Sequence, residues 1–124
     1  MSKEKRKLFL EKISNVIIER SKFSNNHFDI TAATVLENLF CCYVKENEGQ
    51  ISYEKYSQMF TEGSLEYICG GDIAIYHFFI YYAAFPDKEN RLEKFLNCLQ
   101  DKVIEKFDEY LSLYCTTNGL FHFN

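Results

Sequence analysis

An uncharged and strongly apolar run between Asp72 and Asp87 constrains the fold more than any other feature of this sequence. The run contains 14 residues, and no side of it suits water when His77 is neutral. A helix that crosses a bilayer needs roughly 20 apolar residues, so this run is too short to span a membrane. A helix that is apolar on every side is buried in the middle of a domain. We therefore expect residues 73–85 to form a buried central helix.

Both ends of the expected central helix carry termination signals. Asp72 suits the N-terminus, because a short carboxylate accepts hydrogen bonds from the free backbone N–H groups of the first turn. Pro86 limits the other end, because it pushes Phe85 out of helical geometry. A buried strand is the alternative, since Ile, Tyr and Phe favour strands, and the fold would then be α+β. The run is much longer than the usual strand of about 5–6 residues, which favours the helix.

Apolar residues spaced by three and four predict further helices before the apolar run. A first helix is expected over residues 2–22. A second is expected from about Asp29 or Thr31 to Lys45, with either of these residues as its N-cap. A short helix is expected to follow Ser52 and to include Met59 and Phe60 on its buried face.

The same spacing predicts one long helix near the C-terminus. Between Asp87 and about Cys115, apolar residues recur in steps of four, three, four and seven at Leu92, Leu96, Leu99, Val103 and Tyr110. A continuous helix of this length would extend roughly 40 Å at 1.5 Å per residue. We therefore expect an all-α fold with a single domain over residues 1–124. Its architecture would be a five- or six-helix bundle around residues 73–85, with a long C-terminal helix.

Cysteine usage and the N-terminus both indicate a cytoplasmic protein. The chain has five cysteines, an odd number, and no Cys-x-x-Cys pair. Cys41, Cys69, Cys98 and Cys115 are expected to be small buried hydrophobic residues with free thiols. The basic N-terminus leads into an amphipathic pattern that is broken by Glu11 and Lys12, so it does not resemble a secretion signal.

The sequence contains no motif for catalysis, for a cofactor or for a metal. Gly70-Gly71 lacks the Lys-Ser or Lys-Thr that completes a phosphate-binding loop, and no His-Glu-x-x-His or Glu-x-x-His occurs. His77 is expected in the core, hydrogen-bonded to a carbonyl or a tyrosine. Glu105, Asp108 and Glu109 fit the solvated face of the last helix. We therefore expect a protein that is not an enzyme and that needs no cofactor and no metal.

Charge is distributed unevenly along the chain. The net charge is −4, yet the first 12 residues hold five basic and two acidic residues. A nucleic-acid-binding protein would show the opposite overall balance, with a basic face along the phosphates. We therefore expect neither direct nucleic-acid binding nor membrane association.

The stretch Glu46–Asp72 stands out because it is both acidic and rich in tyrosine. It carries six acidic residues against Lys55 alone, a net charge of −5. One interpretation is a solvated edge with some tyrosines in the core. The other is a recognition surface for a basic protein. Tyrosine supplies contact area at low entropic cost, and a surface of one charge sign associates faster with a partner of the opposite charge. The predicted partner-binding residues are Glu46, Glu48, Tyr53, Glu54, Tyr56, Glu62, Glu66, Tyr67 and Asp72.

With this acidic stretch, the chain resembles small bacterial toxin-immunity proteins, such as the inhibitors of contact-dependent growth-inhibition toxins and of nuclease colicins. The resemblance is one of general character and rests on no signature motif. It implies a cytoplasmic, non-catalytic immunity protein or antitoxin. Such a toxin inhibitor acts by a protein–protein interaction that covers the active site of a cognate basic toxin, typically a nuclease.

Three other hypotheses remain open from the sequence. The chain could be a viral or phage-encoded helical decoy of a host protein. It could instead be a ligand-binding or enzymatic helical domain with a pocket lined by Tyr76, His77, Tyr81 and Tyr82. It could also form a homodimer through residues 73–85 or through the apolar tail Leu120–Phe123.

Overall fold

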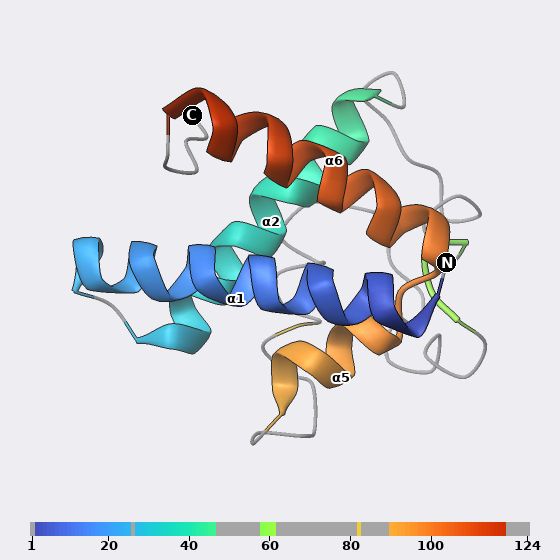
Figure 1. Ribbon diagram of the computed structural model, residues 1–124, viewed down its shortest axis with the longest axis horizontal. Coiled ribbons are helices and arrows are strands. Elements are labelled where there is room, and N and C mark those ends of the chain that lie inside the picture. Colours follow the sequence, from blue (N-terminus) through green and yellow to red (C-terminus); the bar gives the residue numbers. More distant parts are fainter. Residues whose placement is uncertain (1, 26, 47–57, 62–81, 83–89, 119–124) are drawn as a thin grey trace.

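The computed structural model describes residues 2–25, 27–46, 58–61, 82 and 90–118, with the backbone alone for 114–118. Figure 1 shows the whole chain. The described residues form four helices, α1 (Lys3–Ser24), α2 (Phe28–Glu46), α5 (Arg91–Asn97) and α6 (Asp101–Asn118). No strand occurs among them, only an isolated antiparallel bridge between Phe60 and Leu99. The expected all-α class is confirmed for this part of the chain.

Local capping explains where α1 begins and ends. The Ser2 hydroxyl accepts a hydrogen bond from the backbone N–H of Lys5 at 3.2 Å, which satisfies one of the free donors of the first turn. At the other end, Asn25 adopts a left-handed conformation (φ 58°) and its N–H bonds to the Ser21 carbonyl. Asparagine tolerates this conformation better than most residues, so the helix stops there. The expected span of 2–22 is therefore close to the observed one.

The start of α2 differs from expectation. Asp29 and Thr31 both lie inside the helix, and the Thr31 N–H already donates to the His27 carbonyl at 3.1 Å. Neither residue is therefore the N-cap. The Asp29 carboxylate instead accepts a hydrogen bond from the Tyr82 hydroxyl at 3.2 Å, while Thr31 is buried. Asp29 therefore makes a long-range hydrogen bond and Thr31 lies in the core, whereas the sequence analysis expected one of them to cap the helix.

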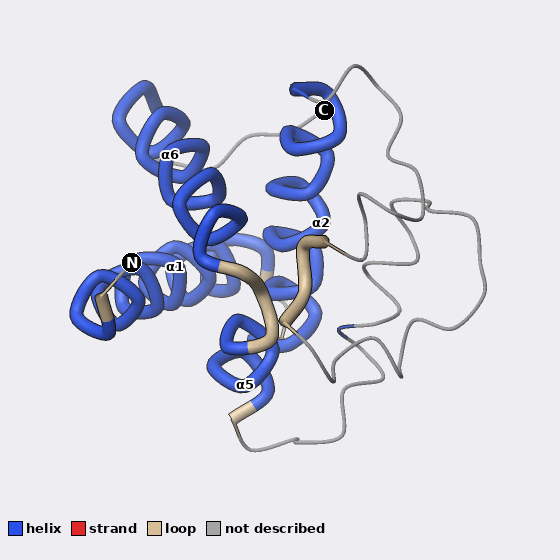
Figure 2. The backbone as a smooth tube through the Cα atoms, turned by 90° about the vertical axis from the view of Figure 1, so that its right-hand side faces the viewer, coloured by secondary structure: helices blue, strands red, loops and turns tan. Residues whose placement is uncertain are grey.

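The expected long C-terminal helix is wrong, because the chain breaks between α5 and α6. The Gln100 N–H donates to the Met59 carbonyl at 2.8 Å, and the Thr61 N–H donates to the Cys98 carbonyl at 2.7 Å. The Gln100 side-chain amide adds a bond to the Phe60 carbonyl at 3.0 Å. These groups pair across the chain in place of continuing the helical ladder, and the two loop segments lie side by side in Figure 2.

Because of this pairing, the last residues of the short helix expected after Ser52 are not helical. Residues 58–61 form a turn and the bridge, although Met59 and Phe60 are buried as expected. The earlier part of that expected helix lies outside the described residues. The expected central helix 73–85 also lies outside the described residues, with the exception of Tyr82. The side chain of Tyr82 is buried, with 1% exposed.

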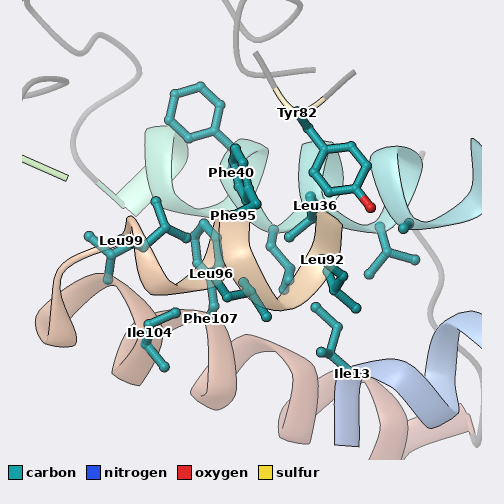
Figure 3. Packing of buried hydrophobic residues seen from close by; sticks show 14 of the residues in the cluster. Ile13, Leu36, Phe40, Tyr82, Leu92, Phe95, Leu96, Leu99, Ile104 and Phe107 are labelled. Carbon is teal, nitrogen blue, oxygen red and sulfur yellow. The ribbon is translucent and has the colours of Figure 1, made fainter. Parts of the chain in front are cut away.

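Helices α1, α2 and α6 pack against one another and enclose the described core (Figures 1 and 2). Phe95 of α5 lies within this core and is fully buried. Its ring meets Tyr82 edge-on at 5.2 Å between centroids and Phe60 edge-on at 6.5 Å. Figure 3 shows Phe95 and Tyr82 together with Ile13 of α1, Leu36 of α2 and Phe107 of α6, all members of one buried cluster. Phe95 therefore joins α5 to the segments around Phe60 and Tyr82.

We expect Phe95→Ala to lower the free energy of unfolding by about 3–5 kcal/mol, because the truncation leaves a cavity among fully buried rings. Urea unfolding followed by circular dichroism measures this change. Phe23→Ala is the matched control, since Phe23 is 82% exposed, and it should change stability by less than about 0.5 kcal/mol. If the two substitutions lowered the free energy of unfolding equally, the packing of Phe95 at the centre of the core would be contradicted.

Candidate functional site

The candidate site from the sequence is the acidic stretch Glu46–Asp72, and the structure describes its first residue and residues 58–61. Glu46 is the one predicted partner-binding residue whose surroundings are known. The other eight lie outside the described residues and their role stays a prediction. They are Glu48, Tyr53, Glu54, Tyr56, Glu62, Glu66, Tyr67 and Asp72.

Glu46 ends α2 and contacts α6. Its carboxylate accepts a hydrogen bond from the Lys106 ammonium at 2.6 Å and another from the Tyr110 hydroxyl. These contacts hold the pKa of Glu46 below its usual value, with the Lys106 hydrogen bond as the largest cause and the Tyr110 bond as the next. Glu46 therefore fastens the end of α2 to α6, while its side chain stays 44% exposed.

The tyrosines beside this carboxylate remain protonated. Burial, and then the bond to Glu46, raises the pKa of Tyr110. Burial and the Glu46 charge also raise the pKa of Tyr43, whose ring meets Phe107 edge-on at 6.5 Å. Sequence reasoning missed Lys106 and Tyr110, because they follow Glu46 by 60 and 64 residues and no local spacing connects them.

The middle of the acidic stretch is fixed to the helical framework. Met59 and Phe60 are almost completely buried, and residues 59–61 pair with residues 98–100 through the backbone bonds given above. In the sequence, Glu62 directly follows this anchored segment.

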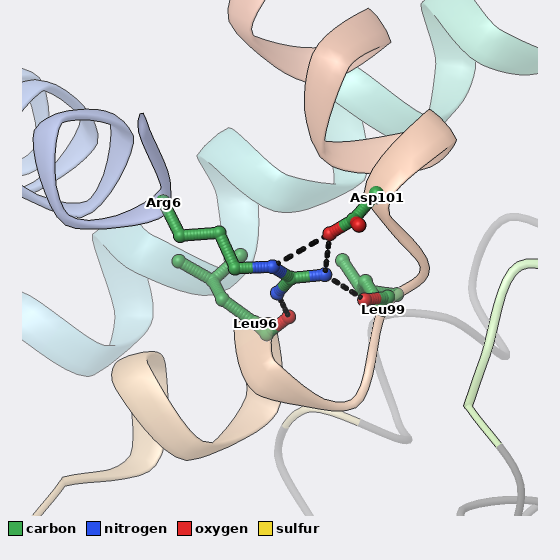
Figure 4. Close-up of polar contacts among 4 residues, drawn as sticks. All are labelled: Arg6, Leu96, Leu99 and Asp101. Atoms are coloured by element: carbon green, nitrogen blue, oxygen red, sulfur yellow. Dashed lines mark hydrogen bonds and ion pairs between the residues drawn. The ribbon is translucent and has the colours of Figure 1, made fainter. Parts of the chain in front are cut away.

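A second polar cluster surrounds Arg6 of α1 (Figure 4). Its guanidinium donates to the Leu96 carbonyl at 3.1 Å, to the Leu99 carbonyl at 2.6 Å and to the Asp101 carboxylate at 2.9 Å. The last carbonyls of a helix lack intrahelical hydrogen-bond donors. Arg6 supplies a donor to one carbonyl at the end of α5 and to one in the turn after it. The hydrogen bond from Arg6 is the main cause that lowers the pKa of Asp101.

A third polar contact also joins α1 to α6. The Lys12 ammonium donates to the Asp108 carboxylate at 3.0 Å and to the Ser112 hydroxyl. Asp108 was expected on the solvated face of the last helix. Its side chain is 44% exposed, as such a face requires, and it also forms an ion pair with Lys12. Together with the pair Arg6–Asp101, this contact shows that α1 and α6 are neighbours from their first residues as far as Lys12 and Ser112.

Tyr82 does not behave as a pocket-lining residue. Its ring is buried against Phe95, its hydroxyl donates to Asp29, and the Arg91 guanidinium lies 5.8 Å from the ring centroid. Burial, followed by the Asp29 charge, raises the pKa of Tyr82. Tyr82 therefore fills the core with its polar end already satisfied. The other three residues of the expected Tyr/His-lined pocket lie outside the described residues.

Three cysteines of the described part of the chain, Cys41, Cys42 and Cys98, form no disulfide. Cys41 and Cys98 were expected to be buried, but like Cys42 they are only half-buried. Burial is the main cause that raises the pKa of Cys41, followed by the charge of Glu37, which keeps this thiol protonated. Cys69 and the side chain of Cys115 lie outside the description. Among the described residues, no three His, Cys, Asp or Glu side chains gather as metal ligands. Within the same residues, no helix is long and apolar enough to cross a membrane.

Comparison with protein-family models, with curated proteins and with solved structures finds no match to this chain.

We expect Arg6→Gln to lower the free energy of unfolding by about 1–3 kcal/mol, because two carbonyls lose a charged donor. Urea unfolding of the variant measures this loss. Lys5→Gln removes the same charge from the preceding residue of α1, which is exposed, and should leave the urea midpoint unchanged within error. An Arg6→Gln midpoint equal to that of Lys5→Gln would show that the cluster contributes nothing to stability.

We expect Glu46→Gln to destabilise the fold at pH 7 more than at pH 3. The folded-state pKa of Glu46 lies below its usual value of 4.5. The stabilisation is therefore present above pH 4.5 and is lost as the pH falls through the folded-state pKa. Urea midpoints of the wild type and the variant at both pH values test this.

Glu105→Gln is the control for the pH experiment, because Glu105 is exposed on α6 and makes no ion pair with a described residue. Its effect should not change between the two pH values. A Glu46→Gln effect that is as large at pH 3 as at pH 7 would rule out the charged form of Glu46 as the stabilising species.

Proposed function

We propose that this protein is a non-catalytic inhibitor of the immunity or antitoxin type, which binds a basic toxin through the acidic stretch Glu46–Asp72. The toxin class that fits best is a nuclease, whose cleft is basic because it holds substrate phosphates. The inhibitor works inside the cytoplasm of the cell that it protects. It needs no cofactor, since its action is to occlude the active site of its partner.

The observation that carries this proposal is where the negative charge lies. Thirteen of the 14 basic residues and 12 of the 18 acidic residues fall outside Glu46–Asp72, so the rest of the chain is close to neutral. The stretch itself carries −5, which exceeds the net charge of −4 of the whole chain. A single-signed surface raises the rate of encounter with an oppositely charged partner.

The described framework supports the proposal because it fixes the stretch at two places. Glu46 is tied to α6 through Lys106 and Tyr110, and residues 59–61 are tied to residues 98–100. A binding segment that is anchored to a rigid scaffold loses less conformational entropy when its partner docks. The carboxylates next to these anchors, such as Glu62, are therefore suited to a defined interface.

The mechanism requires binding alone. Glu and Asp side chains would occupy the places that substrate phosphates take in the toxin cleft, paired with Lys or Arg there. Tyrosines of the stretch would supply apolar contact area around these ion pairs. Because Glu46 already bonds to Lys106 and Tyr110, the carboxylates from Glu48 onward would make the main contribution.

The first experiment is capture of the partner with the tagged full-length chain, at low and at high salt, followed by mass spectrometry. The expected result is one stoichiometric basic protein that is lost at high salt. Its nuclease activity should fall when the inhibitor is added in equimolar amount. Recovery of a partner that is acidic, or whose activity is unaffected, would refute the proposal.

With that partner in hand, we expect Glu54→Lys or Glu66→Lys to slow association by about three- to tenfold at low salt. The physical reason is the loss of attraction before contact, so the effect should shrink as salt rises. Stopped-flow or surface plasmon resonance gives the rates. Glu11→Lys is the matched control, because Glu11 is exposed on α1 outside the stretch. Equal slowing by the control would place the binding surface elsewhere.

A further inference from the structure

Gln100 connects the start of α6 to the middle of the acidic stretch. It is half-buried and directly precedes α6. Its backbone carbonyl accepts the first hydrogen bonds of the helix, from the N–H groups of Val103 at 3.0 Å and Ile104 at 3.1 Å. Its backbone N–H donates to the Met59 carbonyl at 2.8 Å, and its side-chain amide donates to the Phe60 carbonyl at 3.0 Å. One residue therefore contacts both the helix and the anchored part of the stretch.

The side chain of Gln100 makes a tertiary contact instead of capping the helix. Ser, Thr, Asp and Asn are preferred at this position, because their short side chains bond to the free N–H groups of the first turn. Glutamine is longer, and here its amide bonds to the Phe60 carbonyl in a partly buried contact. Met59 and Phe60 are 0% and 2% exposed, and a carbonyl shielded from water needs a hydrogen-bond donor. Gln100 supplies one.

This side-chain bond can be removed without removing the backbone pairing beside it. The bond from the Thr61 N–H to the Cys98 carbonyl uses backbone groups alone, as does the bond from the Gln100 N–H to the Met59 carbonyl. A substitution at Gln100 that keeps its length therefore changes one hydrogen bond of the anchor. The contribution of that bond to the position of residues 59–61 is open to measurement.

We propose that Gln100 is the positioning residue of the acidic stretch. Its amide holds the Phe60 carbonyl, so residues 59–61 keep one conformation before the basic partner arrives. This inference rests on the proposed inhibitor function and assigns it a residue outside Glu46–Asp72. Gln100 contributes to affinity through Phe60 and does not itself bind the partner.

Positioning and charge attraction respond differently to salt. Attraction between opposite charges acts before contact and weakens as salt screens it. A segment held in its binding conformation loses less conformational entropy on docking, and that gain does not depend on ionic strength. A positioning residue therefore changes affinity by the same factor at low and at high salt, whereas a carboxylate of the stretch does not.

The first arm of the test needs no partner and uses amide hydrogen exchange of the full chain followed by NMR. Gln100→Met keeps the length of the side chain and removes its donor. Exchange at the Thr61 N–H should become about three- to tenfold faster, because the anchored segment opens more often. Exchange at Leu39 in the core of α2 should not change. Gln58→Met is the matched control, since Gln58 is exposed in the same segment, and it should leave Thr61 unchanged.

The second arm measures the affinity of the captured basic protein for the full chain. Gln100→Met should weaken binding by about three- to tenfold, and by the same factor at low and at high salt. Asn97→Leu is the control, because it removes an exposed amide at the same junction, outside the stretch, and it should bind as the wild type does.

The outcomes separate this inference from the function on which it rests. Unchanged exchange at Thr61 in Gln100→Met would show that the side chain does not hold the segment. Faster exchange with unchanged affinity would assign Gln100 a structural role alone. A loss of affinity that disappears at high salt would also overturn positioning. Each of these results leaves the acidic stretch as the binding surface, whereas a wild-type chain that binds no basic protein overturns both proposals.

Discussion

The backbone pairing of residues 59–61 with residues 98–100 is the constraint on which the rest of the described structure depends. It uses main-chain groups that would otherwise extend the helix, so α5 ends at Asn97 and α6 starts at Asp101. A buried backbone N–H or carbonyl must find a partner, and here the partner comes from a segment about 40 residues away. The break lets α6 leave the direction of α5 and pack against α1 and α2 (Figure 1).

The polar contacts between helices lie around the edge of the apolar core and hold its parts in register. Arg6 satisfies the carbonyls at the break and pairs with the first residue of α6, while Lys12 and Glu46 join α6 to α1 and α2. Exposed ion pairs contribute little energy, with a median of about 0–1 kcal/mol. Most of the stability therefore comes from buried rings such as Phe95 and Phe107, and the charged groups select one arrangement of the helices.

The distribution of charge along the chain bears on the proposed partner-binding stretch. On the framework, basic and acidic residues are nearly balanced, and several of them are used in pairs between helices. The excess negative charge of the sequence lies in the acidic stretch Glu46–Asp72, which carries a net charge of −5.

Apolar spacing of three and four is a local property, so the sequence alone predicts the helical class of the described residues and most of their buried faces. Phe9, Ile13 and Ile17 of α1 and Leu36, Leu39 and Phe40 of α2 are buried as that spacing predicts. Leu92, Leu96, Leu99 and Val103 are also buried, yet the helix through them is broken, since the spacing continues unchanged across the break. Three features come from tertiary contacts alone: that break, the hydrogen bond from Tyr82 to Asp29, and the hydrogen bonds from Lys106 and Tyr110 to Glu46. Each of these is a hydrogen bond between residues more than 35 positions apart, where a sequence pattern carries no information about which groups will meet.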